Sequence, residues 1–355
     1  MKYNKKKNKC NGNRERDYGL MNPTIHDIAK RANVSISTVS RVVNNPLAVR
    51  EEKRQRVLEA IKELGYEPNP FASGLRDRLT KTIVAIIPDI ANPFYASMFR
   101  GIEDTAREQR NNVMICNTDR NEERFFEYMR YFKKKKVDGI IFASDPLKEH
   151  YYKGFEELNI PVVLAATKSE DHLLPYVKID DYQAGYDAGM FLIRNGHKRI
   201  GMISGPKSDP IAGQPRYEGF LASLKKYERL ADDSVVFGDF QYDSGYSGMG
   251  KLYGKHPDLT AVFAASDEMA LGAMAFLQRR NIDVPRQVSV IGFDNIRFSR
   301  MITPPLTTIS QPIYEIGKEA AMLLYDWIEN RDTIPKGKQL QHELIVRDSV
   351  SNRNT

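Results

Sequence analysis

Cysteine is nearly absent from this 355-residue sequence, which contains only Cys10 and Cys116. Two isolated cysteines cannot form a disulfide scaffold or a cysteine-based metal site, and this usage is typical of a reducing compartment. The sequence also lacks an apolar run long enough to cross a bilayer, and its N-terminus lacks the apolar segment of a secretory signal. These absences predict a cytoplasmic protein that does not contact a membrane.

Signatures of common enzyme classes are missing as well. The sequence has no Gly-x-Gly-x-x-Gly at a strand end, no Walker loop, no nucleophile elbow and no clustered histidines and cysteines. Its six histidines are scattered, and both His26 and His197 are expected at the surface. We therefore expect no enzyme activity, no catalytic residue, no cofactor and no metal ion.

Positive charge is concentrated at one end of the chain. Residues 1–82 contain 18 Lys and Arg against 9 Asp and Glu, a net +9, whereas residues 83–355 contain 35 against 37, a net −2. A surface that binds a phosphate backbone requires such a local excess. Residues 1–20 are basic and poor in apolar side chains, which predicts a disordered extension. This extension either adds non-specific DNA affinity or is dispensable.

Two short helical patterns separated by a tight turn lie within residues 24–45. The first follows Thr24, the second follows Ser35, and both of these residues are preferred helix N-caps. Helices this short are unstable alone and must pack on each other and on a third helix. Packing buries one face of the second helix and leaves a polar face with Arg41 exposed. This is the arrangement of a helix-turn-helix whose second helix enters the DNA major groove, although a plain helical hairpin would show the same spacing.

A third helix is predicted over residues 51–64, where it should bury Val57, Leu58, Ile61 and Leu64 and end at Gly65. The predicted DNA-binding domain therefore spans residues 21–65. Residues 66–82 follow as a linker that is stiffened at first by prolines and contains Leu75. From residue 82 onward, short β-branched runs alternate with helical patterns in two successive series. Such alternation predicts parallel sheets covered by helices, organised as two Rossmann-like lobes with a cleft between them.

Residues 24–45, followed by Tyr66-Glu67-Pro68-Asn69 and Leu75, resemble the DNA-binding head of LacI/GalR-family transcriptional regulators. The remainder, to about residue 349, resembles that family's effector-binding body, which is similar to periplasmic sugar-binding proteins. The fold class implied is α/β, with an all-α helix-turn-helix head joined by a hinge to a two-lobed body. In this body, the first lobe spans about 83–180 and 312–339, and the second spans about 181–311 and 340–349.

The resemblance also implies how this protein would bind DNA. A homodimer would bind a near-palindromic double-stranded operator, with Ser37, Thr38 and Arg41 against base edges. In the family the hinge folds into a helix on DNA, and a leucine that matches Leu75 wedges between base pairs in the minor groove. A flexible linker with an incidental leucine is the alternative. The full set of predicted DNA contacts is Thr24, Ser35, Ile36, Ser37, Thr38, Arg41, Asn44 and Leu75.

A polyhydroxyl ligand needs charged groups that make two hydrogen bonds and an aromatic face for its ring. Arg216, Phe240 and Asp294 supply these types after strands of the second lobe, and they match the family's effector contacts. An N-cap role for Asp294 and a surface ion pair for Arg216 are the alternatives. The predicted effector site comprises Phe94, Tyr95, Arg216, Phe240, Ser266 and Asp294, and the effector is expected to be a sugar or sugar phosphate. The purine-responsive pattern of the family has a second arginine in the loop that matches 205–215, which this sequence lacks, so the resemblance argues against purines.

Segments such as Val162–Ala166 and Ile291–Asn295 also resemble the catabolite-control branch of the family, whose corepressor is a serine-phosphorylated phosphocarrier protein. Docking that phosphate requires basic side chains, but the matching helix holds Met322 and Asp326 at the two key positions. We therefore predict a repressor of carbohydrate-metabolism genes that is controlled by a small sugar-like effector. Catabolite control through the phosphorylated carrier is the alternative, and a sugar-binding or sugar-modifying α/β protein is a remote one.

Overall fold

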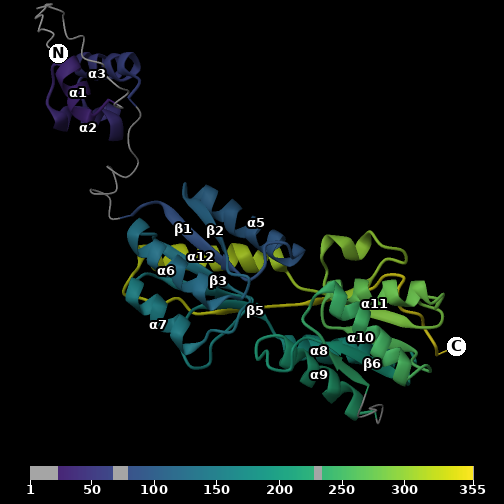
Figure 1. Cartoon of the computed structure of the whole chain (residues 1–355). Coiled ribbons are helices and arrows are strands. Elements are labelled where there is room, and N and C mark those ends of the chain that lie inside the picture. Colours follow the sequence, from purple (N-terminus) through teal and green to yellow (C-terminus); the bar gives the residue numbers. More distant parts are fainter. Residues whose placement is uncertain (1–22, 67–78, 228–233, 355) are drawn as a thin grey trace, which may run out of the picture. The chain divides into compact units, whose positions relative to one another are not determined.

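The computed structural model describes residues 23–66, 79–227 and 234–354. The chain divides into two compact units, residues 1–78 and residues 79–355, which we call the head and the body (Figure 1). The predicted extension 1–20 and most of the predicted hinge, including Leu75, lie outside the described residues. None of the described helices is long and apolar enough to cross a membrane.

The head consists of short helices around a small apolar core. Thr24 precedes the first helix and donates from its backbone N–H and its hydroxyl to the Asp27 carboxylate, at 2.8 and 2.6 Å. Asn33, with φ of 51°, closes the turn before the second helix. Ile28, Val39 and Val57 are fully buried between the helices. The elements are α1 (Ile25–Ala32), α2 (Ile36–Asn44), the 3-10 helix η1 (Pro46–Ala48) and α3 (Glu51–Leu64).

The face that α3 buries is narrower than predicted. Val57 and Ala60 are buried, but Leu58 is 43% exposed and Leu64 is 37% exposed. The prediction that these two leucines belong to the core was therefore wrong. Three short helices meet along a single stripe, and the small side chain of Ala60 on that stripe lets the helices approach closely. Leu58 lies outside the stripe, and Leu64 lies in the last turn of the helix.

The first lobe of the body, lobe 1, is built on a parallel six-stranded sheet in the order β11-β5-β4-β3-β1-β2. Helices α5 and α12 share one apolar cluster with alternate β1 side chains such as Ile83, and α6 and α7 share another with Val84. Both faces of the sheet are therefore covered, as its continuous apolar strands require. The bounds are β1 (Thr82–Ile87), α5 (Pro93–Glu108), β2 (Asn112–Asn117), α6 (Glu122–Lys135), β3 (Gly139–Ala143), α7 (Glu149–Leu158), β4 (Val162–Ala165), β5 (Tyr176–Ile179), α12 (Ile313–Glu329) and β11 (Lys338–Leu340).

The second lobe, lobe 2, contains a six-stranded sheet in the order β12-β10-β9-β8-β6-β7, in which only β12 is antiparallel to its neighbour. Its core is a single large cluster that joins the strands to all four α-helices. The two parallel α/β lobes predicted from the alternating pattern are therefore confirmed. The bounds are α8 (Asp181–Arg194), β6 (Ile200–Ser204), α9 (Gly213–Lys225), β7 (Val235–Phe237), α10 (Tyr242–Lys255), β8 (Ala261–Ala264), α11 (Asp267–Arg279), β9 (Ser289–Asp294), η2 (Arg297–Arg300), β10 (Thr307–Ser310) and β12 (Glu343–Ile345).

The chain passes between the two sheets at three places (Figure 1). The first crossover joins β5 to α8, the second joins β10 to α12, and the third joins β11 to β12. Asp181 lies directly after the first crossover, and Gln311 lies within the second. Any change in the angle between the lobes must therefore be accommodated at these three segments.

His197 is buried, which contradicts its predicted surface position. Its Nδ1 lies 3.1 Å from the Thr260 hydroxyl, and its Nε2 lies 3.1 Å from the Ser351 carbonyl oxygen. Burial lowers the pKa of this imidazole to about 4, with a further contribution from Arg353. The prediction failed because the C-terminal segment, more than 150 residues away in sequence, covers the ring.

Candidate functional site

The exposed face of α2 carries most of the predicted DNA contacts. Ser35 is the N-cap, and its hydroxyl accepts the Thr38 N–H at 3.3 Å and also bonds the hydroxyls of Ser37 and Thr38 at 2.9 and 2.8 Å. Ile36 is 41% exposed. Arg41 is exposed, and no described carboxylate lies within ion-pair distance of it. Thr24 precedes α1, and Asn44 is the last residue of α2.

This face presents small hydroxyls and one guanidinium to the solvent. The Arg41 side chain is longer than the neighbouring serine and threonine side chains, so it can approach a base edge without steric hindrance from them. A guanidinium that has no protein partner can donate two hydrogen bonds to O6 and N7 of guanine. The geometry of α2 is therefore compatible with base readout by Arg41.

The six predicted effector residues all line one cavity of about 330 Å³ in the body. The cavity lies beyond the carboxyl ends of strands from both sheets, where parallel α/β sheets bind ligands. Its volume falls at the lower end of the usual range for small-molecule sites. The predicted residues in its lining are Phe94, Tyr95, Arg216, Phe240, Ser266 and Asp294.

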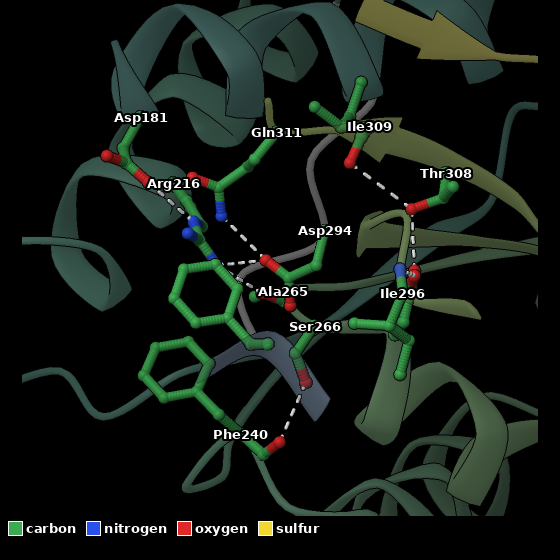
Figure 2. Close-up of polar contacts among 12 residues, drawn as sticks. Asp181, Arg216, Phe240, Ala265, Ser266, Asp294, Ile296, Thr308, Ile309 and Gln311 are labelled. Atoms are coloured by element: carbon green, nitrogen blue, oxygen red, sulfur yellow. Dashed lines mark hydrogen bonds and ion pairs between the residues drawn. The ribbon is translucent and has the colours of Figure 1, made fainter. Parts of the chain in front are cut away.

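Arg216, on α9, is buried and held from three sides. Its Nε donates to Asp181 Oδ1 at 2.8 Å, and its Nη1 donates to the Ala265 carbonyl oxygen at 2.7 Å (Figure 2). Its guanidinium carbon lies 3.7 Å from the centre of the Phe293 ring. These contacts fix the orientation of the guanidinium plane, so a ligand would meet a rigid donor.

Asp294 is the last residue of β9 and has a positive φ of 112°. One carboxylate oxygen accepts a hydrogen bond from Gln311 Nε2 at 2.7 Å, and the same oxygen lies 4.0 Å from Arg216 Nη1 (Figure 2). Burial raises the pKa of this carboxyl to about 7, although Arg216 and Gln311 both favour the charged form. Near neutral pH the group can therefore either accept or donate a hydrogen bond to a ligand hydroxyl.

Phe240 forms one wall of the cavity in a strained conformation, since its φ is 69°. Its ring packs directly on Gly205, where a Cβ atom would come within 2.1 Å of the ring. Its carbonyl oxygen accepts a hydrogen bond from the Ser266 hydroxyl at 3.0 Å (Figure 2). The same hydroxyl caps α11 by accepting the Met269 N–H at 3.1 Å. The Ser266 hydroxyl thus donates one hydrogen bond to Phe240 and accepts one from the first turn of α11, so it links the two.

Asp267 lies behind the cavity wall and is fully buried. Its two carboxylate oxygens accept hydrogen bonds from the Thr308 hydroxyl at 2.6 Å and from the Ile296 N–H at 2.8 Å. Burial, followed by repulsion from Asp294, raises its pKa well above the usual value. These bonds tie the loop after β9 to strand β10 and so position the Asp294 carboxyl.

Three important residues were not predicted from the sequence. Asp181 orients Arg216, Lys178 pairs with Asp181 Oδ2 at 2.8 Å, and Gln311 bonds Asp294. Asp181 and Gln311 closely follow the strands β5 and β10. The rule that ligands bind beyond the carboxyl ends of strands applies to every strand, so applying it to these two would have indicated both positions.

Comparison with known proteins matches both units of the chain. Residues 24–69 match the bacterial regulatory proteins of the lacI family, and residues 80–348 match the periplasmic binding proteins and sugar-binding domain of the LacI family. Catabolite control protein A of Priestia megaterium is 41% identical over 332 residues, which cover 93% of this chain and 100% of that protein.

Solved structures agree with these matches. The complex of the transcriptional regulator CelR with cellobiose is 33% identical, with a TM-score of 0.71 over 92% of this chain and 99% of that one. The lac repressor dimer bound to operator and an anti-inducer is 24% identical, with a TM-score of 0.83 over 93% and 100% of the two chains, and it shows the same fold. These relatives are regulators rather than enzymes, as predicted for this chain. The chain belongs to the LacI family of bacterial transcriptional regulators.

Proposed function

We propose that this protein is a cytoplasmic, homodimeric repressor of carbohydrate-metabolism genes. It binds a near-palindromic operator through its heads, and a sugar-like effector in the cavity of the body controls that binding. Ser37, Thr38 and Arg41 would contact base edges, while Thr24, Ser35, Ile36 and Asn44 would contact the backbone or flanking groups. Leu75, outside the described residues, would act in the hinge.

The hydrogen bonds of Arg216 and Asp294 are the observation that carries this proposal. Arg216 bonds Asp181, directly after the first crossover, and Asp294 bonds Gln311, within the second. A ligand that displaced both side chains would therefore act on two of the three crossovers, which set the angle between the lobes. Allosteric control requires two distinct sites and a conformational change that links them, and this arrangement would supply the link.

The charges around the cavity favour an uncharged sugar over a sugar phosphate. Two of its cations, Lys178 and Arg216, are already paired with Asp181, and Lys148 is paired with Glu122. Of the cations in the described lining, only Arg120 forms no ion pair, so a phosphate would compete with the existing pairs and meet several carboxylates, whereas sugar hydroxyls can donate to carboxylates. The charged lining residues are Asp89, Arg120, Asp145, Lys148, Lys178, Asp181, Asp209, Arg216, Glu268 and Asp294.

A protein corepressor is the second candidate, because the relative with 41% identity is a catabolite control protein. The surface of α12 argues against it. Met322 is 40% exposed and Asp326 is also exposed, so a phosphoserine placed there would meet a thioether and a carboxylate. The Tyr314 hydroxyl, nearby on this helix, donates to Asp104 at 3.1 Å. Micromolar binding of a serine-phosphorylated phosphocarrier protein would support this candidate instead.

The proposal can be tested by measuring operator affinity in the presence of sugars. The operator would first be selected from random duplexes, and its binding followed by fluorescence anisotropy with a panel of free sugars and their phosphates. We expect at least one free sugar to change the affinity in wild type but not in Arg216→Gln. Arg100→Gln, an exposed arginine on α5, is the matched control and should respond as wild type does. Operator affinity that no sugar changes would contradict the proposal.

A further inference from the structure

A basic surface lies at the amino-terminal edge of the lobe 1 sheet. Four consecutive lysines, Lys133–Lys136, end α6 and lead into β3, while Lys81 precedes β1 and Arg110 precedes β2. Backbone hydrogen bonds join these segments, from Asn112 N to the Lys81 carbonyl oxygen and from Asp138 N to the Thr82 carbonyl oxygen, both at 2.9 Å. All six basic side chains are exposed. We call this surface the basic edge.

Several basic side chains of lobe 1 are compensated by ion pairs, whereas five members of the basic edge form none with a described carboxylate. Arg107, Arg124 and Lys148 each form an ion pair with a carboxylate. Within the described part of the chain, no carboxylate lies within ion-pair distance of Lys81, Arg110, Lys133, Lys134 or Lys136. Like charges that are left uncompensated repel one another, so this edge is better suited to an anionic partner than to solvent alone.

The backbone conformation of three of these residues supports the same view. Lys81, Arg110 and Lys136 have φ values of 55°, 55° and 52°. Glycine or asparagine adopts this left-handed region most easily, yet the chain places a basic residue there three times at one edge. The helix dipole explains a preference for lysine in the last turn of α6, but it does not explain Lys81 or Arg110, which lie outside that turn.

The basic edge is also where the linker from the head enters the body. The backbone N–H groups of Thr80 and Thr82 donate to the two Asp138 carboxylate oxygens at 2.8 and 3.0 Å, and the Thr80 hydroxyl donates to the Lys136 carbonyl oxygen at 3.1 Å. The entry point is therefore fixed beside the lysines. Within the body, the basic edge therefore surrounds the point at which the chain arrives from the DNA-binding head.

We propose that the basic edge is a second DNA-binding surface, which binds the phosphate backbone of double-stranded DNA outside the sequence contacted by the head. Exposed lysines on a scaffold contact phosphates as point charges and carry no base specificity. The edge therefore adds affinity that depends on salt and on the length of the duplex. It does not alter which operator sequence is preferred.

The test uses the full chain with Lys133→Gln, Lys134→Gln and Lys136→Gln combined. The matched control combines Lys225→Gln, Lys226→Gln and Lys251→Gln, which removes the same charge from exposed positions of lobe 2. Binding is measured without effector on two duplexes that contain the same selected operator, one of about 18 bp and one of about 50 bp. The shorter duplex spans little more than two half-sites one helical turn apart. Thermal unfolding checks that both variants are folded.

On the longer duplex we expect the lysine variant to bind more weakly than wild type at 50 mM salt. If the edges of a dimer neutralise two phosphates, this defect should shrink by roughly 12-fold on raising salt to 200 mM, at ~0.9 counterions per phosphate. On the shorter duplex the variant should match wild type, and the control should match wild type on both. An equal defect on both duplexes, an unchanged salt dependence, or the same defect in the control would overturn the proposal.

Discussion

Replacing Asp294 with Asn is expected to flatten the pH dependence of the body's stability. In the folded protein, burial raises the pKa of Asp294 to about 7, whereas an aspartate in the unfolded chain titrates near its ordinary value of 3.8. Between these two values the folded state binds more protons than the unfolded state. The free energy of unfolding therefore falls as pH rises through this window, and Asp294 destabilises the folded protein most above pH 7.

The magnitude follows from the size of the shift. A difference of about three pKa units corresponds to about 4 kcal/mol, at 1.36 kcal/mol per unit. Integration over the two titrations places about 2.5 kcal/mol of this loss between pH 5 and pH 8. For a unit the size of the body, this free energy corresponds to a decrease of roughly 4–5 °C in melting temperature. Asn cannot ionise, so this contribution disappears in the variant.

The assay is differential scanning calorimetry of wild type and Asp294→Asn at pH 5 and pH 8. The measured quantity is the change in the body's melting temperature with pH in each protein. Asp145→Asn serves as a comparison, because burial raises the pKa of Asp145 only to about 6 and its contribution should be about half as large. If wild type and Asp294→Asn lose the same number of degrees between pH 5 and pH 8, the reasoning about this carboxyl is refuted.

Three further changes test other parts of the molecule. Arg41→Ala should weaken operator binding by about 1–3 kcal/mol but barely affect random DNA, and equal losses in anisotropy titrations would show a phosphate contact only. Gly205→Ala should displace the Phe240 ring, which a Cβ atom would approach to 2.1 Å, so the response to the effector should weaken while operator affinity stays intact. His197→Gln should lower the melting temperature at pH 7 but remove about 2 kcal/mol of the acid sensitivity between pH 7 and pH 4.5, because the folded imidazole resists protonation below its unfolded pKa of 6.5. If calorimetry shows that the melting temperature of His197→Gln falls as much as that of wild type between pH 7 and pH 4.5, the assignment of this acid sensitivity to His197 is contradicted.

Local patterns in the sequence predicted most of the fold. The β-branched runs of the body and the helical spacing between them specify buried strands and amphipathic helices, and the two lobes alternate strands and helices as that pattern predicts. The same local reasoning failed for Leu58 and Leu64, because it cannot show how wide a stripe the neighbouring helices cover. It also failed for His197, whose burial depends on Ser351, 154 residues away.

The candidate effector site shows the same division. We predicted Arg216, Phe240 and Asp294 from residue type and from their position after a strand, and all three line the same cavity. Position after a strand would also have indicated Asp181 and Gln311, but which side chain each of them bonds depends on contacts 35 and 17 residues apart in the sequence. Ser266 was predicted as a direct effector contact and does line the cavity, but its hydroxyl already bonds Phe240 and Met269. Internal hydrogen bonding of this kind is invisible in sequence.

The three crossovers have a consequence for how specificity can diversify. A single connection would leave the relative motion of the lobes largely free, whereas three connections restrict it. On the proposed function, the cavity side chains can therefore be exchanged to suit a new ligand while the hydrogen bonds of Asp181 and Gln311 keep linking the cavity to two of the crossovers. Grafting the cavity lining of another family member onto this body should thus change the signal that is sensed while leaving the response at the operator intact.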